Sequence, residues 1–333
     1  MVRVWRAAGV AARQEEAMAE VEHPDWNDRA STHQNAVRAQ YIDGELRDRE
    51  AHAQTLAELR ELGLMKHVAE LDAVGYTTIH GALDADQVAR ARAAIARVMQ
   101  RKSGLAVDLE SETADAWSGI SLAHYLLFED EVFESILMTA KPLALVTYLL
   151  GRSCVLSSMT CHFKGPGGEA GRLHSDNGGI PSPFSMVSQV ANVNYALTPY
   201  SREAGALAMV PGSHRLCRQP SASESHLAGG RTHPDAVAMD LAPGDCVVWH
   251  GNTWHGSFRR EVPGIRMNLA TYFARQFVVT QEEFGRAVPR EMLDRHANEP
   301  RFARLLGQSQ PYNYHAEGPD WEKFAVRPRG QFD

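Results

Sequence analysis

Two histidines and one aspartate have the residue types and spacing that could hold a redox-active metal in this 333-residue chain. His174 and Asp176 are separated by one residue, and positions i and i+2 of an extended segment face the same side. His255 follows Asp176 by 79 positions (255 − 176), and we expect a strand late in the fold to carry it. A His-x-Asp tripeptide alone is more often an exposed surface segment than a metal site. Two histidines and one carboxylate around an ion, however, leave three adjacent positions open, as in non-haem Fe(II) oxygenases.

The segment Trp249–Ser257 contains two histidines, and only one of them is needed as a ligand. His250 and His255 are five residues apart, so on one continuous strand they would point to opposite faces. The intervening Gly251-Asn252-Thr253 can turn the chain back toward a cavity. We therefore expect His255 to be the ligand and His250 to be a core or supporting residue.

A basic residue follows the second histidine at a spacing that suggests a carboxylate clamp. Arg266 lies 11 residues after His255 (266 − 255), beyond the turn Val262-Pro263-Gly264. A hairpin of this length would return Arg266 to the side of His255, where its guanidinium could form two parallel hydrogen bonds to a carboxylate. Ser257, on the same strand face as His255, could donate another. This combination suits a dicarboxylate co-substrate such as 2-oxoglutarate.

Short strands separated by turn residues must position these side chains. The predicted strands are Val155 to Phe163, Ser188 to Leu197, Ala206 to Val210, Val237 to Leu241, Cys246 to Trp249 and Arg266 to Phe273. Their even spacing predicts a mainly β fold with flanking helices (α+β), built as a sandwich or jelly-roll barrel.

Helical patterning dominates the part of the chain before these strands. A short strand at Gly75 to Ile79 is followed by Asp84–Gln87, which supplies N-cap chemistry for a helix from Val88 to Met99. A second helical segment is expected from Glu129 to Leu150, with Pro142 marking a break or the start of a new helix.

The domain organisation follows from these elements. We predict a polar helical N-terminal extension at 1–67, one barrel domain with N-terminal helices at 68–280, and a C-terminal helical or loop extension at 281–333 packed on the same domain. The sequence has no internal repeat and no linker long enough to separate two domains.

The order of the motifs resembles that of the phytanoyl-CoA dioxygenase (PhyH) family of Fe(II)/2-oxoglutarate-dependent oxygenases, over about residues 68–275. The resemblance is carried by Gly75-Tyr76, Ala82-Leu83-Asp84, His174-Ser175-Asp176, Gly205-Ala206-Leu207, Val210-Pro211-Gly212-Ser213-His214, Pro243-Gly244-Asp245, His255-Gly256-Ser257 and Arg266. It implies a double-stranded β-helix (a jelly-roll, cupin-like barrel).

The same resemblance implies roles for individual residues. His174, Asp176 and His255 would be the iron ligands, and Arg266 and Ser257 would hold the distal carboxylate of 2-oxoglutarate. Related halogenases lack the carboxylate ligand, so the presence of Asp176 favours hydroxylation over halogenation.

Further residues are candidates for the cavity wall. The strand that carries Asn192 and Asn194 departs from relatives, which often have Gln and a large aromatic there; if its face is inward, both line the co-substrate or substrate cavity. His162 would contact co-substrate or product if it faces inward, although a hydrogen-bonded core histidine is the more common case. Arg172 shares the parity of His174, and Trp254 is either a core residue or a wall of the substrate pocket.

Three other features have more than one interpretation. His214, in the Pro211–His214 turn, is expected to be structural rather than a ligand. The Gly/Pro-rich segment 177–187 is either a lid over the substrate or a simple connection. The aromatic tail Gln310–His315 is a lid, an oligomer contact or surface packing.

Composition excludes several classes of protein. A net charge of −7 without a long Lys/Arg block gives no electrostatic footprint for nucleic-acid binding. The apolar stretch Ile136 to Leu150 is interrupted by Lys141 and Pro142, so we expect no membrane span. The N-terminal apolar run is too short for a secretory signal, and the four cysteines show no paired spacing. We expect a cytoplasmic protein that acts on a small molecule. The sequence is compatible with a homo-oligomer.

The sequence thus predicts a dioxygenase that uses Fe(II), 2-oxoglutarate and O2 to hydroxylate or otherwise oxidise an unactivated C–H bond, releasing succinate and CO2. Secondary metabolism or small-molecule catabolism is the expected setting. The alternatives are a non-redox, metal-dependent cupin-type isomerase or hydrolase and a non-catalytic binding barrel. Neither alternative needs a carboxylate clamp beside the metal.

Overall fold

The computed structural model describes residues 51–109, 120–167, 169–308, 314–315 and 318–319. Residues 1–50 of the predicted N-terminal extension lie outside the described residues, and so does most of the aromatic tail. The chain divides into two compact units, and the strands and helices that surround the candidate site belong to the unit of Arg47–Tyr312. In the other unit β11 (Tyr314–His315) pairs with β12 (Gly318–Pro319). The predicted three-part domain division stays a prediction.

Six antiparallel strands form the larger sheet, in the order β1-β8-β5-β10-β3-β2. They are β1 (Tyr76–Ile79), β8 (Cys246–His250), β5 (Val190–Ala196), β10 (Asn268–Ala274), β3 (Val155–Lys164) and β2 (Ile120–Ala123). β5 and β8 are buried at every position, which means that both faces of this sheet are covered at its centre.

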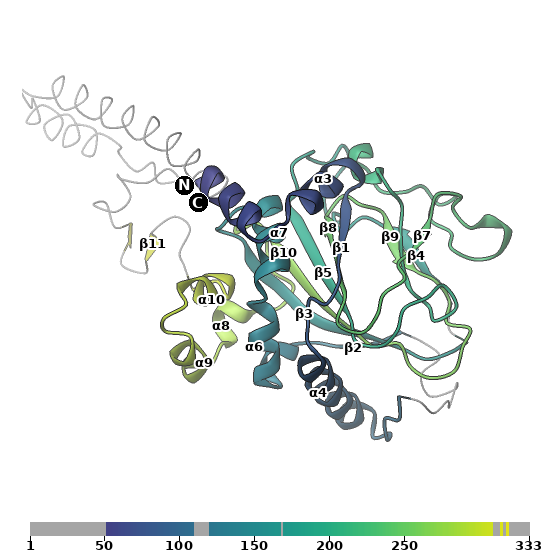
Figure 1. The fold of residues 1–333 in the computed structure, drawn as a ribbon, viewed down its shortest axis with the longest axis horizontal. Coiled ribbons are helices and arrows are strands. Elements are labelled where there is room, and N and C mark those ends of the chain that lie inside the picture. Colours follow the sequence, from purple (N-terminus) through teal and green to yellow (C-terminus); the bar gives the residue numbers. More distant parts are fainter. Residues whose placement is uncertain (1–50, 110–119, 168, 309–313, 316–317, 320–333) are drawn as a thin grey trace, which may run out of the picture. The chain divides into compact units, whose positions relative to one another are not determined.

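Four strands form the smaller sheet, in the order β4-β9-β6-β7. They are β4 (Gly171–His174), β9 (His255–Ser257), β6 (Leu207–Met209) and β7 (Val237–Ala238). An apolar cluster that includes Leu207 and Met209 from this sheet and Val247 and Trp249 from the larger one joins the two sheets. The two sheets therefore pack face to face as a double-stranded β-helix (Figure 1).

Helices cover the outer face of the six-stranded sheet, on the side away from the smaller sheet (Figure 1). Residues 51–61 are helical, and the further helices are α3 (Met65–Val74), α4 (Ala85–Ser103), α6 (Glu131–Leu137), α7 (Ala140–Leu150), α8 (Phe284–Ala287), α9 (Arg290–Arg295) and α10 (Pro300–Leu305), with 3-10 turns at Leu126–Phe128, Ser213–Leu216 and Gly229–Arg231. α7 packs on β5 and β8, and α10 contacts β3. The main apolar core lies between these helices and the sheet.

Local sequence explains where these helices begin and end. Asp84 and Gln87 form a reciprocal capping box at the start of α4, and Gly104, with a φ of 71°, ends it. The predicted helical segment Glu129–Leu150 is two helices, broken at residues 138–139. Pro142 stands in the first turn of α7, where a missing backbone N–H costs nothing. The proline thus marks the start of a new helix.

The predicted fold class, mainly β with flanking helices in a double-stranded β-helix, is confirmed. Strand ends differ by a few residues. Of the strand predicted at Val237 to Leu241, Val237–Ala238 pairs with β6, and Leu241 forms an isolated antiparallel bridge with Tyr200. Among the described residues no single helix is long and apolar enough to span a membrane; the bent pair α6–α7, which meet at 55°, passes that test together by length and composition.

The predicted hairpin between His255 and Arg266 is wrong. His255 begins β9 in the four-stranded sheet, whereas Arg266 leads into β10 in the six-stranded sheet. Arg266 instead forms an isolated antiparallel bridge with Lys164 at the end of β3. The chain crosses from one sheet to the other between the two residues, so they line the same cavity from different sheets.

Candidate metal centre

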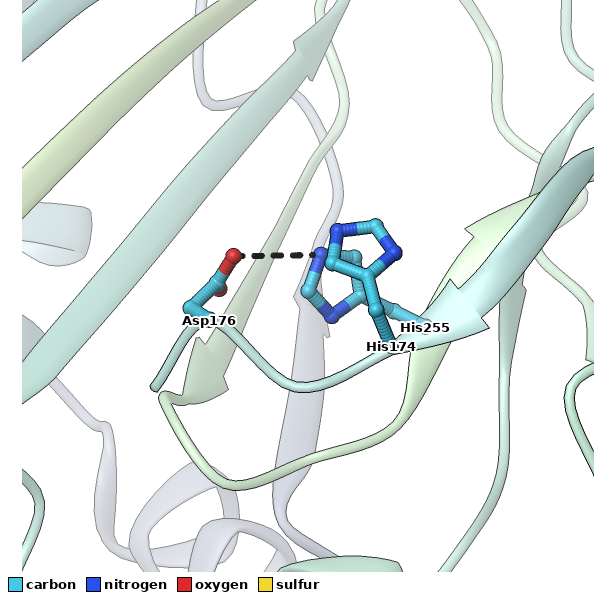
Figure 2. Close-up of side chains that lie close together, drawn as sticks. All are labelled: His174, Asp176 and His255. Carbon is cyan, nitrogen blue, oxygen red and sulfur yellow. Dashed lines mark ion pairs between the residues drawn. The ribbon is translucent and has the colours of Figure 1, made fainter. Parts of the chain in front are cut away.

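Strand pairing brings the two predicted histidine ligands together. In the register of β4 and β9, His174 lies opposite His255, and their ring centroids are 4.4 Å apart. Asp176 follows in the bend after β4, and its Oδ1 lies 3.5 Å from His255 Nε2 (Figure 2). One candidate ligand atom from each of the three residues lies within 4.8 Å of the others. The cluster predicted from the sequence can therefore hold a metal ion, with the two histidines on paired strands and Asp176 in the bend after β4.

Backbone carbonyls fix the tautomers of both histidines. His174 Nδ1 lies 3.0 Å from the carbonyl oxygen of Arg172, and His255 Nδ1 lies 3.0 Å from that of Thr253. A carbonyl only accepts, so each Nδ1 carries the proton and each Nε2 presents a lone pair. Burial lowers the pKa of His255, which keeps its imidazole in the neutral form that binds metals.

Four hydrogen bonds hold Asp176. Its Oδ2 accepts hydrogen bonds from Asn192 Nδ2 at 2.8 Å and from Trp249 Nε1 at 3.1 Å. Its backbone N–H donates to the Gly251 carbonyl at 3.1 Å, and its own carbonyl accepts from the Tyr272 hydroxyl at 3.4 Å. This arrangement leaves Oδ1 as the oxygen that faces the imidazoles.

The three residues line a cavity of about 730 Å³ between the two sheets. Side chains of β3, β10, β5 and β8 form the wall of the cavity on the side of the larger sheet. Residues that are partners in the strand register form rows across these four strands. The row beneath Asp176 consists of Ser158, Tyr272, Asn192 and Trp249. The next row consists of Thr160, Ala270 and Asn194, and His162 and Asn268 lie beyond it. The cavity is therefore rich in hydroxyl, amide and imidazole groups.

Arg266 lines the same cavity and is buried, with 4% of its surface exposed. Its Nη1 donates to the Gly205 carbonyl at 2.7 Å, and its guanidinium carbon lies 5.6 Å from the ring centroid of Tyr200. Its Nε is buried without a hydrogen-bond partner, and among the described residues no carboxylate forms an ion pair with it. A buried guanidinium with an unused donor is built to receive an anion.

A second buried cation strengthens the positive potential at this end of the cavity. Lys164 stands opposite Arg266 in their antiparallel bridge, and its Nζ donates to the carbonyls of Glu169 and Phe258. Burial, together with the charge of Arg266, lowers the pKa of Lys164 to about 8.

The predicted partner of Arg266 is also present. Ser257 lines the cavity, and a Cβ on Gly171 across the β4–β9 pair would lie only 2.7 Å from its Oγ. The absence of a side chain at Gly171 is therefore what leaves room for this hydroxyl.

The remaining candidates divide into cavity residues and core residues. Arg172, Asn192, Asn194 and His162 all line the cavity. Asn192 contacts Asp176, and the Oδ1 of Asn194 accepts from the Tyr200 hydroxyl at 3.3 Å. His162 is part of the wall rather than the core, and burial lowers its pKa to about 4.

The histidines expected to be structural lie outside the cavity, as does Trp254. His250 is buried and His214 stands next to it, with ring centroids 5.4 Å apart. Trp254 packs with Leu173 and Phe258 and donates to the Arg218 carbonyl. All residues of segment 177–187 are described, and none lines the cavity.

Sequence reasoning missed three aromatic residues of the site, namely Trp249, Tyr200 and Tyr272. Each acts through a polar or ring contact with a residue far away in the sequence. Trp249 begins the segment Trp249–Ser257 that contains His255, but its role depends on its register opposite Asn192. A strand register is not readable from one sequence.

Comparison with known proteins agrees with this geometry. Residues 71–268 match the family model described as phytanoyl-CoA dioxygenase (PhyH). The match covers more than half of the chain and includes all three candidate metal ligands. The chain belongs to this family. As a PhyH family member, it is an enzyme of the Fe(II)/2-oxoglutarate-dependent type.

The relatives of this PhyH protein are distant. Over 225 residues it is 24% identical to the uncharacterized protein Rv1501 of Mycobacterium tuberculosis, covering 66% of this chain and 78% of the relative. Over 135 residues it is 31% identical to the dioxygenase af480 of Aspergillus fumigatus, covering 40% of this chain and 41% of that one. The fold matches HygX of Streptomyces hygroscopicus, solved with nickel and 2-oxoglutarate, with a TM-score of 0.54, 16% identity, and coverage of 65% of this chain and 88% of HygX.

Proposed function

We propose that this protein is a dioxygenase that couples the oxidation of 2-oxoglutarate to the hydroxylation of an unactivated C–H bond in a small organic substrate. The observation that carries the proposal is one cavity lined both by the His174–Asp176–His255 cluster and by a buried arginine with an unpaired donor. In the overall reaction, substrate R–H, 2-oxoglutarate and O2 give R–OH, succinate and CO2.

The chain's own atoms suit an Fe(II) ion. Nε2 of His174, Oδ1 of Asp176 and Nε2 of His255 would hold it, because the other polar atoms of these side chains are already hydrogen-bonded to the protein. A set of two imidazoles and one carboxylate leaves three adjacent positions open. Bound iron supplies the oxygen chemistry, and the protein supplies the ligand geometry and a shielded cavity.

The carboxylate clamp would orient the co-substrate. The Arg266 guanidinium would donate to the distal carboxylate of 2-oxoglutarate, with a further hydrogen bond from the Ser257 hydroxyl. Tyr200, which lies beside the guanidinium, and the Gly205 carbonyl hold Arg266 in place. The other end of the co-substrate would then be directed toward the metal.

The remaining cavity wall would receive the substrate. Thr160 and His162 on β3 and His124 beyond β2 line the side toward the sheet edge. Burial keeps His162 neutral, so this wall offers hydrogen bonds more than positive charge. A small polar organic molecule fits such a wall. HygX, which shares the fold, was solved with hygromycin B bound.

Two alternatives are disfavoured by a specific observation. The alternatives are a non-redox isomerase or hydrolase and a non-catalytic binding barrel. Neither of them needs a buried arginine in the cavity that holds the three candidate metal ligands. Halogenation is disfavoured by Asp176, since a carboxylate would occupy the position that a halide needs.

The proposal is tested by anaerobic reconstitution with Fe(II) and 2-oxoglutarate, followed by admission of O2 in the presence of a library of small molecules. A compound that accelerates succinate release and becomes heavier by one oxygen atom supports hydroxylation. Binding of 2-oxoglutarate that does not depend on the metal would contradict the proposal, as would succinate formation at the same rate without added Fe(II).

A further inference from the structure

Asp176 stands where the sheet no longer positions it. β4 ends at His174, so the backbone pairing that fixes the two histidines against each other does not extend to the carboxylate. A carboxylate on a bend can rotate about its side-chain torsions and can present either one or both oxygens to an ion. Something other than strand pairing must therefore select its orientation.

Two side chains on the opposite sheet make that selection. Asn192 on β5 and Trp249 on β8 are neighbours in the register of the larger sheet, and both donate to the same oxygen of Asp176. At 2.8 and 3.1 Å the two bonds have ordinary hydrogen-bond lengths. Both strands are buried over their full length, which holds the donors rigidly.

We propose that Asn192 and Trp249 are positioning residues for the metal: by donating to Oδ2 of Asp176 they hold this carboxylate so that Oδ1 alone faces the ion. The inference rests on the proposed function, because it takes His174, Asp176 and His255 as the ligands. Asn192 and the indole N–H of Trp249 act through Asp176. The Trp249 ring also packs against His255, with ring centroids 4.8 Å apart, so a test of the N–H has to keep an aromatic ring at this position.

Holding one oxygen away from the ion has a chemical consequence. An ion bound by a single carboxylate oxygen keeps a coordination position that a two-oxygen carboxylate would fill. Second-layer hydrogen bonds of this kind typically change metal affinity by 10- to 100-fold when they are removed. The residues therefore affect both how tightly the metal binds and how many positions stay open.

The test measures Co(II) binding to the full chain, without 2-oxoglutarate or substrate. The variants are Trp249→Phe, which removes the indole N–H and keeps an aromatic ring, and Asn192→Ala. We expect each to raise the Co(II) Kd about 10-fold. We also expect the visible absorption of the bound Co(II) to change, because the released carboxylate can bind through both oxygens.

Trp254→Phe is the matched control. Trp254 is also buried and also donates its indole N–H, but to the Arg218 carbonyl outside the cavity. If removing any buried indole N–H merely loosens the fold, this variant will lower the melting temperature and weaken Co(II) binding as Trp249→Phe does, and the inference is overturned. An unaltered Co(II) affinity and spectrum in Trp249→Phe and Asn192→Ala also overturns it.

The remaining outcomes are equally informative. If Trp249→Phe does not fold, Asn192→Ala decides the question alone, with circular dichroism confirming that it is folded. Wild-type protein that binds no Co(II) contradicts the proposed function itself and removes the inference with it. Wild-type binding with unchanged variants contradicts only the positioning role.

Discussion

At Arg266 a single side chain links the fold to the choice of co-substrate. Its guanidinium is buried and is held by the Gly205 carbonyl and the Tyr200 ring, and yet its Nε has no partner. A hydrogen bond from a charged guanidinium to an anion in the cavity is worth about 1.5–3 kcal/mol.

Replacing Arg266 with Ala should raise the concentration of 2-oxoglutarate needed for half-maximal binding. Loss of a charge-assisted contact costs about 2 kcal/mol, or a factor of about 30. Calorimetric titration of the metal-loaded protein measures the change, and Arg202→Ala is the control, since Arg202 stacks on Phe258 and does not line the cavity. Equal 2-oxoglutarate affinity in Arg266→Ala and wild type would remove the clamp from the account.

The sequence was sufficient to identify the residues whose type alone indicates metal or carboxylate binding. His174, Asp176, His255 and Arg266 could be chosen from the sequence, and the structure brings all four to one cavity. Arg266 reaches it from the larger sheet and not through the hairpin that its spacing predicted. Trp249 could not be chosen in this way, because an indole near a carboxylate has no sequence signature.

At the scale of elements, the pairing of β4 with β9 determines whether the two histidines meet. Gly256 lies between His255 and Ser257, and a Cβ there would be 2.7 Å from the Gly171 carbonyl oxygen and 2.9 Å from that of Arg172. Both obstacles are backbone atoms of β4 and cannot rotate away. The strands can approach this closely only because residue 256 has no side chain.

We expect Gly256→Ala to push β9 away from β4. Overpacking of this kind costs about 1–3 kcal/mol, and the separation of the histidines should weaken Co(II) binding as well. Urea unfolding and Co(II) titration measure the two effects. Gly230→Ala, where an added Cβ meets nothing within 4 Å, is the control and should change neither quantity. Wild-type behaviour of Gly256→Ala would show that the β4–β9 spacing is not what sets the site.

Element types were predictable from the sequence, but element pairing was only partly so. β-branched and aromatic runs located most strands, and Asp84 and Gln87 located the start of α4. The hairpin expected between His255 and Arg266 failed because consecutive strands usually pair, whereas this fold sends β9 and β10 to different sheets. Local spacing carries no information about which sheet a strand joins.

At the scale of the whole molecule, buried neutral histidines make the stability depend on pH. His250 Nδ1 accepts from the Asn252 N–H at 3.1 Å, and its Nε2 lies 3.1 Å from the Met186 carbonyl oxygen. These contacts suit only the neutral ring, and burial lowers the pKa of His250 to about 4. The unfolded chain, with an ordinary histidine pKa, therefore takes up the proton first as the pH falls.

The free energy of unfolding of the metal-free protein should consequently fall between pH 7 and pH 5, by about 2 kcal/mol for His250 alone. The loss begins near the unfolded pKa of about 6.5 and levels off below the folded pKa of His250, about 4. His250→Gln keeps one acceptor and one donor without titrating, so its unfolding free energy should depend less steeply on pH. Urea unfolding at both pH values tests this, and parallel pH profiles for the two proteins would contradict it.

The central claim is that His174, Asp176 and His255 would hold the iron at which O2 oxidises 2-oxoglutarate. The most direct measurement compares succinate formation by wild type and by Asp176→Ala, both shown to be folded, after anaerobic loading with Fe(II) and 2-oxoglutarate and admission of O2. We predict that wild type forms succinate and that Asp176→Ala forms none above the protein-free background. Substantial succinate formation by Asp176→Ala would contradict the claim.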